Sequence, residues 1–83
     1  MNFPQYRKKF DSQSFYKITS FTSFEEIQLI GKRFFIHNVL VDKYFEKIQI
    51  LDMLNISSEL YQLSSESEYM EHAINAANYL SSQ

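Results

Sequence analysis

Apolar residues recur at steps of three and four through the middle of the chain, from Ser23 to Asn55. The positions are Ile27, Ile30, Phe34, His37, Val41, Tyr44, Ile48 and Leu51. This spacing, apolar except at His37, places the side chains on one face of a helix. Ser23, followed three residues later by Glu26, forms a capping box that satisfies unpaired backbone N–H groups at a helix start. The pattern therefore predicts a long central helix over about 23–54.

A second interpretation divides this stretch at Gly31, because glycine destabilises a helix interior and is the residue most used to end a helix. The segment that follows, 33–41, is rich in β-branched and aromatic residues, which favour strands. In this alternative the chain is an α+β fold with short strands near 14–20 and 33–41, and a helix begins with Asp42 as its cap. We favour the continuous helix, because residues 33–41 lack clean alternation and a strand there has few partners.

Residues 1–22 combine aromatic and basic side chains and are interpreted as an arm before the central helix. The aromatic residues are Phe3, Tyr6, Phe10, Phe15, Tyr16 and Phe21, and the basic ones are Arg7, Lys8, Lys9 and Lys17. Basic residues among aromatic ones are typical of nucleic-acid contacts, in which phosphates pair with cations and bases stack on rings. The simpler interpretation, which we favour, is that the rings pack on the central helix and the cations face water.

The last part of the chain, 57–80, is predicted as a second helical segment. Ser57 or Ser58 can cap its beginning, and Ser65 with Glu68 forms a further capping box after a break in the serine cluster. Three alanines in the stripe that follows allow another helix to approach closely. The predicted fold class is therefore all-α: a helical hairpin or small bundle, which two copies close into a four-helix bundle with coiled-coil-like packing.

The chain has 83 residues, of which 45% are hydrophobic and 17% aromatic. That length fits a single domain over 1–83, and a domain so small buries only about 60% of the surface of its unfolded chain. The aromatic content exceeds what such a core encloses, so we expect self-association, as a homo-oligomer, or a place as a subunit beside a protein partner. The residues expected to bind the partner are Phe10, Phe15, Tyr16, Phe34, Phe35, Tyr44 and Phe45.

The formal net charge is −2, with a basic first part and an acidic last part of the chain. No cysteine and one glycine are present, which excludes disulfides, thiol chemistry and a glycine-rich phosphate loop. Glu68 and His72 share a helix face, but a metal site needs a third ligand that nothing nearby supplies. We therefore expect no catalytic, cofactor-binding or metal-binding residues and no enzyme. No apolar run approaches the ~20 residues of a membrane span, so the predicted location is cytoplasmic.

Two functions are consistent with these observations. The first is a small helical interaction protein, such as a regulator, inhibitor, adaptor or accessory subunit, which binds a partner through its aromatic face. The alternative is a small dimeric DNA-binding transcriptional regulator of the strand-helix-helix type, in which residues 14–20 form a paired β-ribbon. Nucleic-acid binding is the weaker expectation, because an acidic chain has few cations to neutralise phosphates beyond Arg7, Lys8, Lys9 and Lys17.

Overall fold

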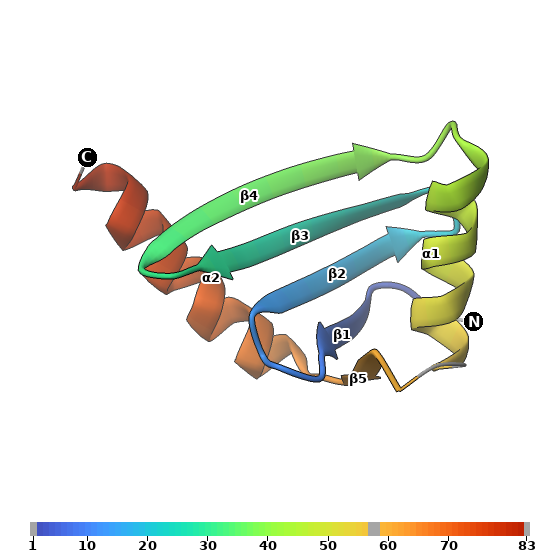
Figure 1. The fold of residues 1–83 in the computed structure, drawn as a ribbon, viewed down its shortest axis with the longest axis horizontal. Helices are drawn as coiled ribbons and strands as arrows, with labels where there is room; N and C mark the ends of the chain where they lie inside the picture. The colour runs from blue at the N-terminus through green and yellow to red at the C-terminus, as the bar shows by residue number, and fades with distance from the viewer. Residues whose placement is uncertain (1, 57–58, 83) are drawn as a thin grey trace.

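The computed structural model describes residues 2–56 and 59–82 and shows an α+β fold (Figure 1). A five-stranded antiparallel sheet has the strand order β4-β3-β2-β1-β5, and two helices pack against it. The elements in chain order are β1 (Gln5–Lys9), β2 (Ser14–Ser20), β3 (Ser23–Ile30), β4 (Arg33–Leu40), α1 (Tyr44–Asn55), β5 (Tyr61–Leu63) and α2 (Glu66–Ser81). The all-α prediction is therefore wrong, and so are the helical bundle and the coiled-coil-like packing that went with it.

The first four strands form a meander, in which each strand pairs antiparallel with the next through a short turn. The turn between β3 and β4 has Gly31 and Lys32 at its centre, with Ile30 opposite Arg33. Gly31 has a φ of 62°, which suits the first central position of a type II′ turn, a type that matches the twist of a two-residue hairpin. Gly31 therefore joins two strands, and the helix predicted across it does not form.

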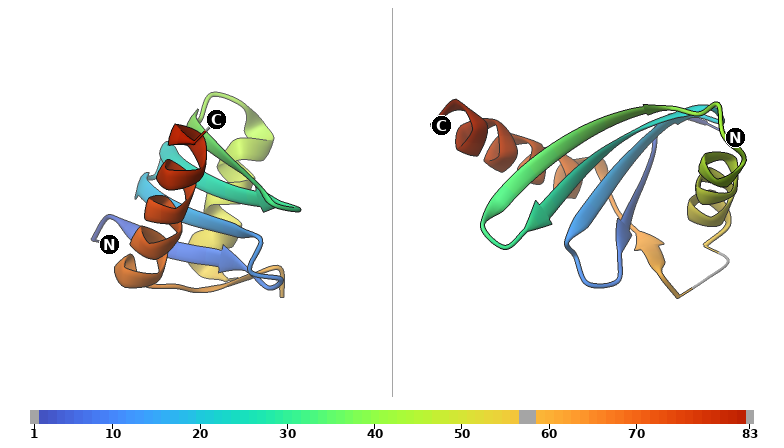
Figure 2. Two further views of the ribbon diagram at one scale, coloured as in Figure 1. Left: turned by 90° about the vertical axis from the view of Figure 1, so that its left-hand side faces the viewer. Right: turned by 45° about the horizontal axis from the view of Figure 1, so that its top comes forward.

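Alternation along the strands gives the sheet two faces, and one helix packs on each face (Figures 1 and 2). The α1 face carries the larger cluster of buried side chains, formed by Tyr16, Ile18, Phe24, Val41, Ile50, Met53, Leu54 and Tyr61. The α2 face carries a smaller cluster, formed by Phe15, Ile27, Tyr69 and Ala76. The core therefore consists of two separate layers, one on each side of the sheet.

Two adjacent residues of β1 anchor the two helices, and the first is Arg7. Arg7 is buried on the α1 face, where its Nε donates to the carbonyl oxygen of Met53 at 2.8 Å and its Nη2 to that of Leu54 at 3.3 Å. The last turn of α1 contains no basic residue of its own. The guanidinium therefore satisfies carbonyl groups at the C-terminal end of the helix and opposes the helix dipole. Burial lowers the pKa of Arg7 from its ordinary value.

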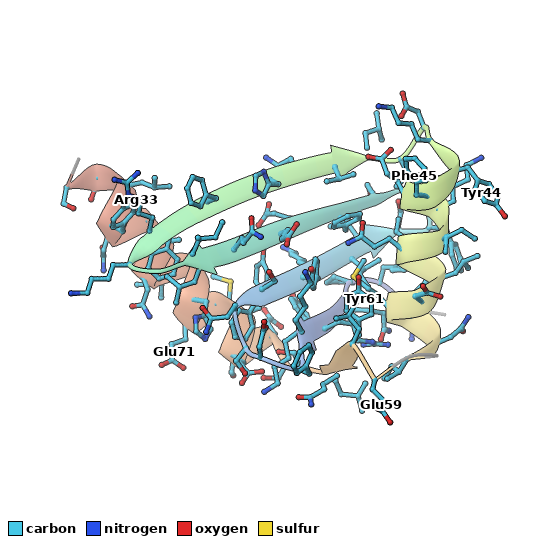
Figure 3. All side chains as sticks on the ribbon, in the orientation of Figure 1. Arg33, Tyr44, Phe45, Glu59, Tyr61 and Glu71 are labelled. Carbon is cyan, nitrogen blue, oxygen red and sulfur yellow. The ribbon has the colours of Figure 1, made fainter. Side chains whose placement is uncertain are left out.

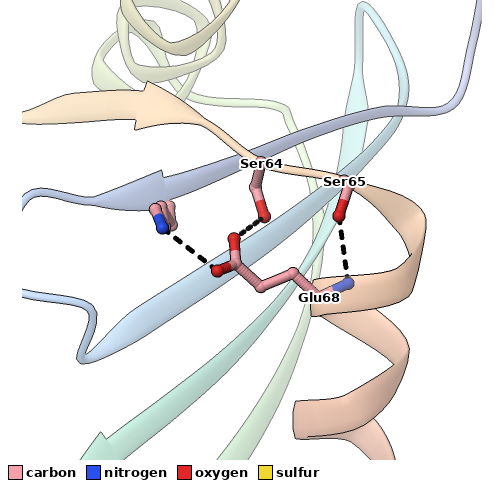
Figure 4. Close-up of polar contacts among 4 residues, drawn as sticks. Ser64, Ser65 and Glu68 are labelled. Atoms are coloured by element: carbon pink, nitrogen blue, oxygen red, sulfur yellow. Dashed lines mark hydrogen bonds and ion pairs between the residues drawn. The ribbon is translucent and has the colours of Figure 1, made fainter.

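The second anchor is Lys8, which points to the α2 face and reaches the first turn of α2. The Nζ of Lys8 lies 3.1 Å from Oε2 of Glu68, and the hydroxyl of Ser64 donates to Oε1 of Glu68 at 2.6 Å (Figure 4). The hydrogen bond from Ser64, and after it the contact with Lys8, lowers the pKa of Glu68. Ser65 accepts a hydrogen bond from the backbone N–H of Glu68 at 3.1 Å, which confirms the predicted cap at this residue.

The stretch predicted as a central helix contains β3, β4 and α1. Apolar residues of β3 serve both faces of the sheet: Phe24 lies under α1, and Ile27 lies under α2. A strand that is covered on both faces has no strict alternation, so the three-residue spacing of these two side chains imitates a helix. Only Tyr44–Asn55 is helical, and it begins shortly after Asp42, close to the start in the alternative interpretation.

That alternative also placed strands near 14–20 and 33–41, which correspond to β2 and β4. The predicted N-cap, Ser23, begins β3 instead of a helix. Its hydroxyl lies 2.6 Å from the hydroxyl of Thr19 and 2.7 Å from that of Ser20, so it closes the β2–β3 turn. A serine that bonds to neighbouring residues favours turns and helix starts alike, which is why the sequence alone misled here.

The predicted helical segment over 57–80 divides into a strand and a helix. Residues 61–63 form β5, which pairs antiparallel with β1 and completes the sheet. The helix begins at Glu66, after the serine cluster. The caps predicted at Ser57 or Ser58 lie outside the described residues.

Candidate interaction surface

The side of α1 that points away from the sheet carries four exposed apolar side chains, which we call the α1 outer face: Tyr44, Phe45, Ile48 and Leu51. The exposed Asn55, at the last position of the helix, lies on the same side. Tyr44 and Phe45 are 77% and 73% exposed, and Figure 3 shows Tyr44 directed away from the sheet and Phe45 beside the end of β4. The other side of the same helix supplies the core residues Ile50, Met53 and Leu54. A helix that is apolar on both sides is typical of one covered on both sides.

Contacts at both ends hold α1 in place. At its start, the carboxylate of Glu46 accepts from the backbone N–H groups of Asp42 at 3.5 Å and Lys43 at 3.3 Å, as in one half of a capping box. At its end, Ile56 adopts a left-handed conformation with a φ of 49°, and its N–H donates to the carbonyl of Asp52. Because both ends are fixed, the α1 outer face has a defined position at the end of the sheet.

β4 is an outermost strand, so no strand of the described residues lies along one side of its backbone. The N–H of Val41 donates to the carbonyl of Thr22 at 2.7 Å, and the β3–β4 register continues from there without a shift. Hydrogen-bonded and non-hydrogen-bonded pairs alternate along an antiparallel ladder, so every second residue of β4 directs its N–H and C=O outward. We call these outward-facing residues the β4 edge: Phe34, Ile36, Asn38 and Leu40.

Apolar side chains of β4 are exposed on both faces of the sheet. Phe35 is exposed on the α1 face, while Ile36 and Leu40 are 42% and 77% exposed on the α2 face. A long apolar strand at an edge is a template for another strand, and proteins normally shorten or charge such edges. The opposite edge, β5, has only three residues, whereas β4 carries no charge between Phe34 and Leu40.

A hollow of about 270 Å³ lies over the last residues of β4 and the adjoining parts of β2 and β3. It is lined by Thr19, Ser23, Phe24, Glu25, Asn38, Val39 and Leu40. Its walls combine apolar side chains with hydroxyl, amide and carboxylate groups.

The apolar stripe of α2 reaches past the sheet. Tyr69, Ala76 and Leu80 follow at steps of seven and four and so share one side of the helix. Tyr69 and Ala76 are buried against the sheet, yet Leu80 is 45% exposed. The rings of Tyr79 and Phe34 contact each other with centroids 5.8 Å apart, and Figure 1 shows the last turns of α2 extending beyond the start of β4. Leu80 therefore faces the space beside the β4 edge.

The aromatic residues predicted to bind a partner fall into two groups. The exposed ones are Phe10, Phe35, Tyr44 and Phe45, and the buried or half-buried ones are Phe15, Tyr16 and Phe34. The structure brings Tyr44 and Phe45 together on the α1 outer face. Sequence reasoning missed the aliphatic part of the surface, because the helical interpretation placed these residues inside a bundle: Ile36, Leu40, Ile48, Leu51 and Leu80. The uncharged run at 34–41 is the signal that marks an open edge.

The basic residues predicted as nucleic-acid contacts do not lie on one surface. Arg7 is buried against α1, and Lys8 pairs with Glu68. Lys9 and Lys17 are half-buried and point to opposite faces of the sheet. Nucleic-acid contact through these four residues stays a prediction.

Two buried tyrosines are the most strongly perturbed titratable groups. Burial, and after it the charge of Glu26, raises the pKa of Tyr16 above its ordinary value. Burial, and after it the hydrogen bond that its hydroxyl donates to the carboxylate of Glu25, raises the pKa of Tyr69. Both side chains are therefore neutral phenols at physiological pH. The hydroxyl of Tyr69 donates to Glu25, whereas the buried hydroxyl of Tyr16 has no hydrogen-bond partner among the described residues.

Within residues 2–56 and 59–82, no three His, Asp or Glu side chains lie close enough to hold one metal ion. Neither helix in the described part of the chain is long and apolar enough to cross a membrane. Comparison of the chain with models of known protein families, with curated proteins and with solved structures found no match. The exposed apolar surface is therefore the guide to function.

Proposed function

We propose that this protein is a non-enzymatic interaction domain that binds another protein through the α1 outer face. The observation that carries the proposal is that both sides of α1 are apolar while only one side packs on the sheet. Burying a large apolar side chain such as that of Tyr44 or Phe45 contributes roughly 1.5–3 kcal/mol relative to leaving it in water. A partner that covers the α1 outer face gains this free energy, which supports a role in binding.

The arrangement of the α1 outer face favours a helix as the partner's contacting element. Tyr44, Ile48 and Leu51 follow at steps of four and three, which forms a ridge of the kind that packs between the ridges of another helix. Lys47 and Asp52 border this ridge and supply a polar rim, as at typical interfaces. The expected partner is therefore a protein that presents the apolar side of an amphipathic helix.

Removing two side chains of the ridge tests the proposal. We expect the double variant Tyr44→Ser/Leu51→Ser to lose a protein that the unmodified chain retains on affinity capture from its source cell. Binding of that protein, once purified, should weaken at least about tenfold, which corresponds to about 1.4 kcal/mol. Circular dichroism should not change, because both side chains are exposed.

The matched control is Met70→Ser/Ile74→Ser, which removes two exposed apolar side chains from α2. This control should retain the partner, because its substitutions lie on the other helix. Identical sets of retained proteins for the unmodified chain, the double variant and the control would contradict binding through the α1 outer face.

A dimeric DNA-binding regulator is a second candidate, because the strand that it requires over 14–20 is present as β2. β2 lies between β1 and β3 in the sheet, so DNA would have to contact a surface other than a free ribbon of β2 strands. A shift of duplex DNA that weakens steeply with salt and is lost in Lys9→Gln/Lys17→Gln would support this candidate. Absence of any shift at low salt would remove it.

A further inference from the structure

We propose that two copies of this chain associate through their β4 edges, which pair antiparallel about a twofold axis and join the two sheets into one. Ile36 and Asn38 direct their backbone N–H and C=O groups away from β3, and no residue in the described part of the chain pairs with those groups. A second strand beside β4 replaces their hydrogen bonds to water with a ladder. It also covers the exposed side chains Ile36 and Leu40.

The sequence of β4 favours one register for this pairing. Outward-facing residues of the two copies must lie opposite each other, and an axis at His37 pairs the whole of 34–40 with its counterpart. The facing pairs are Phe34 with Leu40, Phe35 with Val39, Ile36 with Asn38, and His37 with His37 of the second copy. Leu40, the most exposed side chain of β4, gains an aromatic neighbour in this register.

Charges at the two ends of β4 match in the same register. Lys32, in the turn before β4, comes opposite Asp42 of the second copy, and the axis repeats this pair at the other end. Lys32 and Asp42 lie just outside the two ends of β4, and opposite charges that approach each other there favour this register. A shift of two residues in either direction separates Lys32 from Asp42, so these charges help to fix the register.

The overhanging end of α2 covers the added strand. Tyr79 contacts Phe34, and Phe34 lies opposite Leu40 of the second copy on the α2 face. The exposed Leu80 is therefore placed over the second copy's Leu40, and the twofold axis makes this contact reciprocal. An unrelated peptide would leave its own outer edge unpaired, whereas a second copy satisfies both edges and both helix ends at once.

Asn38→Pro tests the backbone pairing. The substitution removes an N–H that faces outward, at an edge position where proline is tolerated, so the fold is kept while the ladder is interrupted. We expect a dimer for the unmodified chain at tens of micromolar, by light scattering coupled to size exclusion, and a monomer for Asn38→Pro. Asn38→Ser retains the N–H and should stay dimeric.

A second pair of variants guards against misfolding of the proline variant. Ile36→Lys places a charge at the β4 edge, as natural edge strands do, and should also give a folded monomer. Ile74→Lys places the same charge at an exposed apolar position on α2 and should leave the dimer intact. Circular dichroism and the thermal midpoint report whether each variant is folded.

A cysteine scan reports the register directly, because the chain contains no cysteine of its own. Residue 37 faces itself across the axis as a non-hydrogen-bonded pair, with Cα atoms about 4.5 Å apart, which is within the range for a disulfide. Mild oxidation should link His37→Cys into a covalent dimer. Asn38→Cys faces Ile36 and points to the other side of the sheet, so it should stay unlinked.

The β4 edge and the α1 outer face are separate surfaces, so their failures can be told apart. An unmodified chain that is monomeric at this concentration overturns the β4 pairing, as does a dimer that survives both Asn38→Pro and Ile36→Lys. Neither result affects partner loss by Tyr44→Ser/Leu51→Ser. Conversely, a dimer that is lost in Asn38→Pro, together with unchanged partner capture by Tyr44→Ser/Leu51→Ser, supports the pairing and contradicts binding through α1.

Discussion

The two faces of the sheet hold their helices by different physical means. On the α1 face, large aromatic and aliphatic side chains fill the space under the helix, and the buried Arg7 bonds to carbonyl groups of its last turn. On the α2 face, Ala76 lets the helix approach closely, and the half-exposed Lys8 pairs with its first turn. Arg7 and Lys8 are neighbours in β1, and successive side chains of a strand point to opposite faces of the sheet. One strand therefore contacts both helices. The α1 face therefore depends more on buried volume, and the α2 face more on close approach.

Among these substitutions, Met53→Ala should lower the free energy of unfolding the most, because it removes packing between α1 and the sheet. The Met53 side chain is fully buried in the α1 cluster, so its truncation removes apolar contacts and leaves a cavity, at a cost of about 2–5 kcal/mol in the free energy of unfolding. Chemical denaturation measures the change. Leu51→Ala, on the exposed side of the same helix, should cost less than about 1 kcal/mol, and equal losses for the two variants would contradict the assignment of the buried side.

Arg7→Met should also destabilise the protein, because it removes the hydrogen bonds between Arg7 and the end of α1. The substitution leaves the carbonyls of Met53 and Leu54 buried without the charged donor that bonds them, and hydrogen bonds to charged groups contribute about 1.5–3 kcal/mol. Urea denaturation should show a loss of that size. Arg33→Met, at the exposed start of β4, is the matched control and should change stability by less than about 0.5 kcal/mol.

Ala76→Leu should destabilise the protein, because a larger side chain does not fit between α2 and the sheet. Ala76 is fully buried where α2 crosses the sheet, so the added atoms push the helix outward at a cost of about 1–3 kcal/mol. Ala77→Leu, at the next and exposed position, should leave the thermal midpoint nearly unchanged. A stabilised Ala76→Leu variant would show that the two faces are packed in the same way.

Glu68→Gln should have the smallest effect, because the pair with Lys8 is partly exposed to solvent and such pairs contribute about 0.5 kcal/mol. Folding lowers the pKa of Glu68 below its unfolded value of about 4.3. Its contribution is therefore present above that pH and is lost as the pH falls through the folded pKa. In unfolding measurements, the difference in stability from the unmodified chain should be smaller at pH 3 than at pH 7. Glu71→Gln, directed to solvent in Figure 3, should show no difference at either pH.

Some of this architecture could be predicted from the sequence because its cause is local. The cap at Ser65 depends on residues within one turn, and the strand over 14–20 follows from β-branched and aromatic residues. Tyr44 and Phe45 are exposed, but the predicted helix placed Tyr44 on its apolar seam, and their binding to a partner stays a prediction.

The rest could not be predicted because it depends on contacts between distant segments. Phe24 and Ile27 lie under different helices, which hides the strand period of β3. β5 has three residues and is a strand only because β1 lies beside it. Arg7 and Lys8 contact different helices because they alternate along a strand. The sequence analysis interpreted this segment as an arm whose cations face water, so it could not predict these contacts. The open side of β4 is a property of strand order, and no local pattern encodes strand order.

The pairing of β1 with β5 sets the order in which the chain can be completed during synthesis. Arg7 lies opposite Leu63 in that ladder, and Lys8 finds its partner only at Glu68. While the ribosome is still producing the middle of the chain, the meander can close, but β1 lacks its neighbour β5, and Lys8 lacks its partner Glu68. Contacts this distant in sequence form late because the intervening loop must first be ordered. Of the five strands, β1 comes first in the sequence, yet it is enclosed only after β5 and the start of α2 have formed.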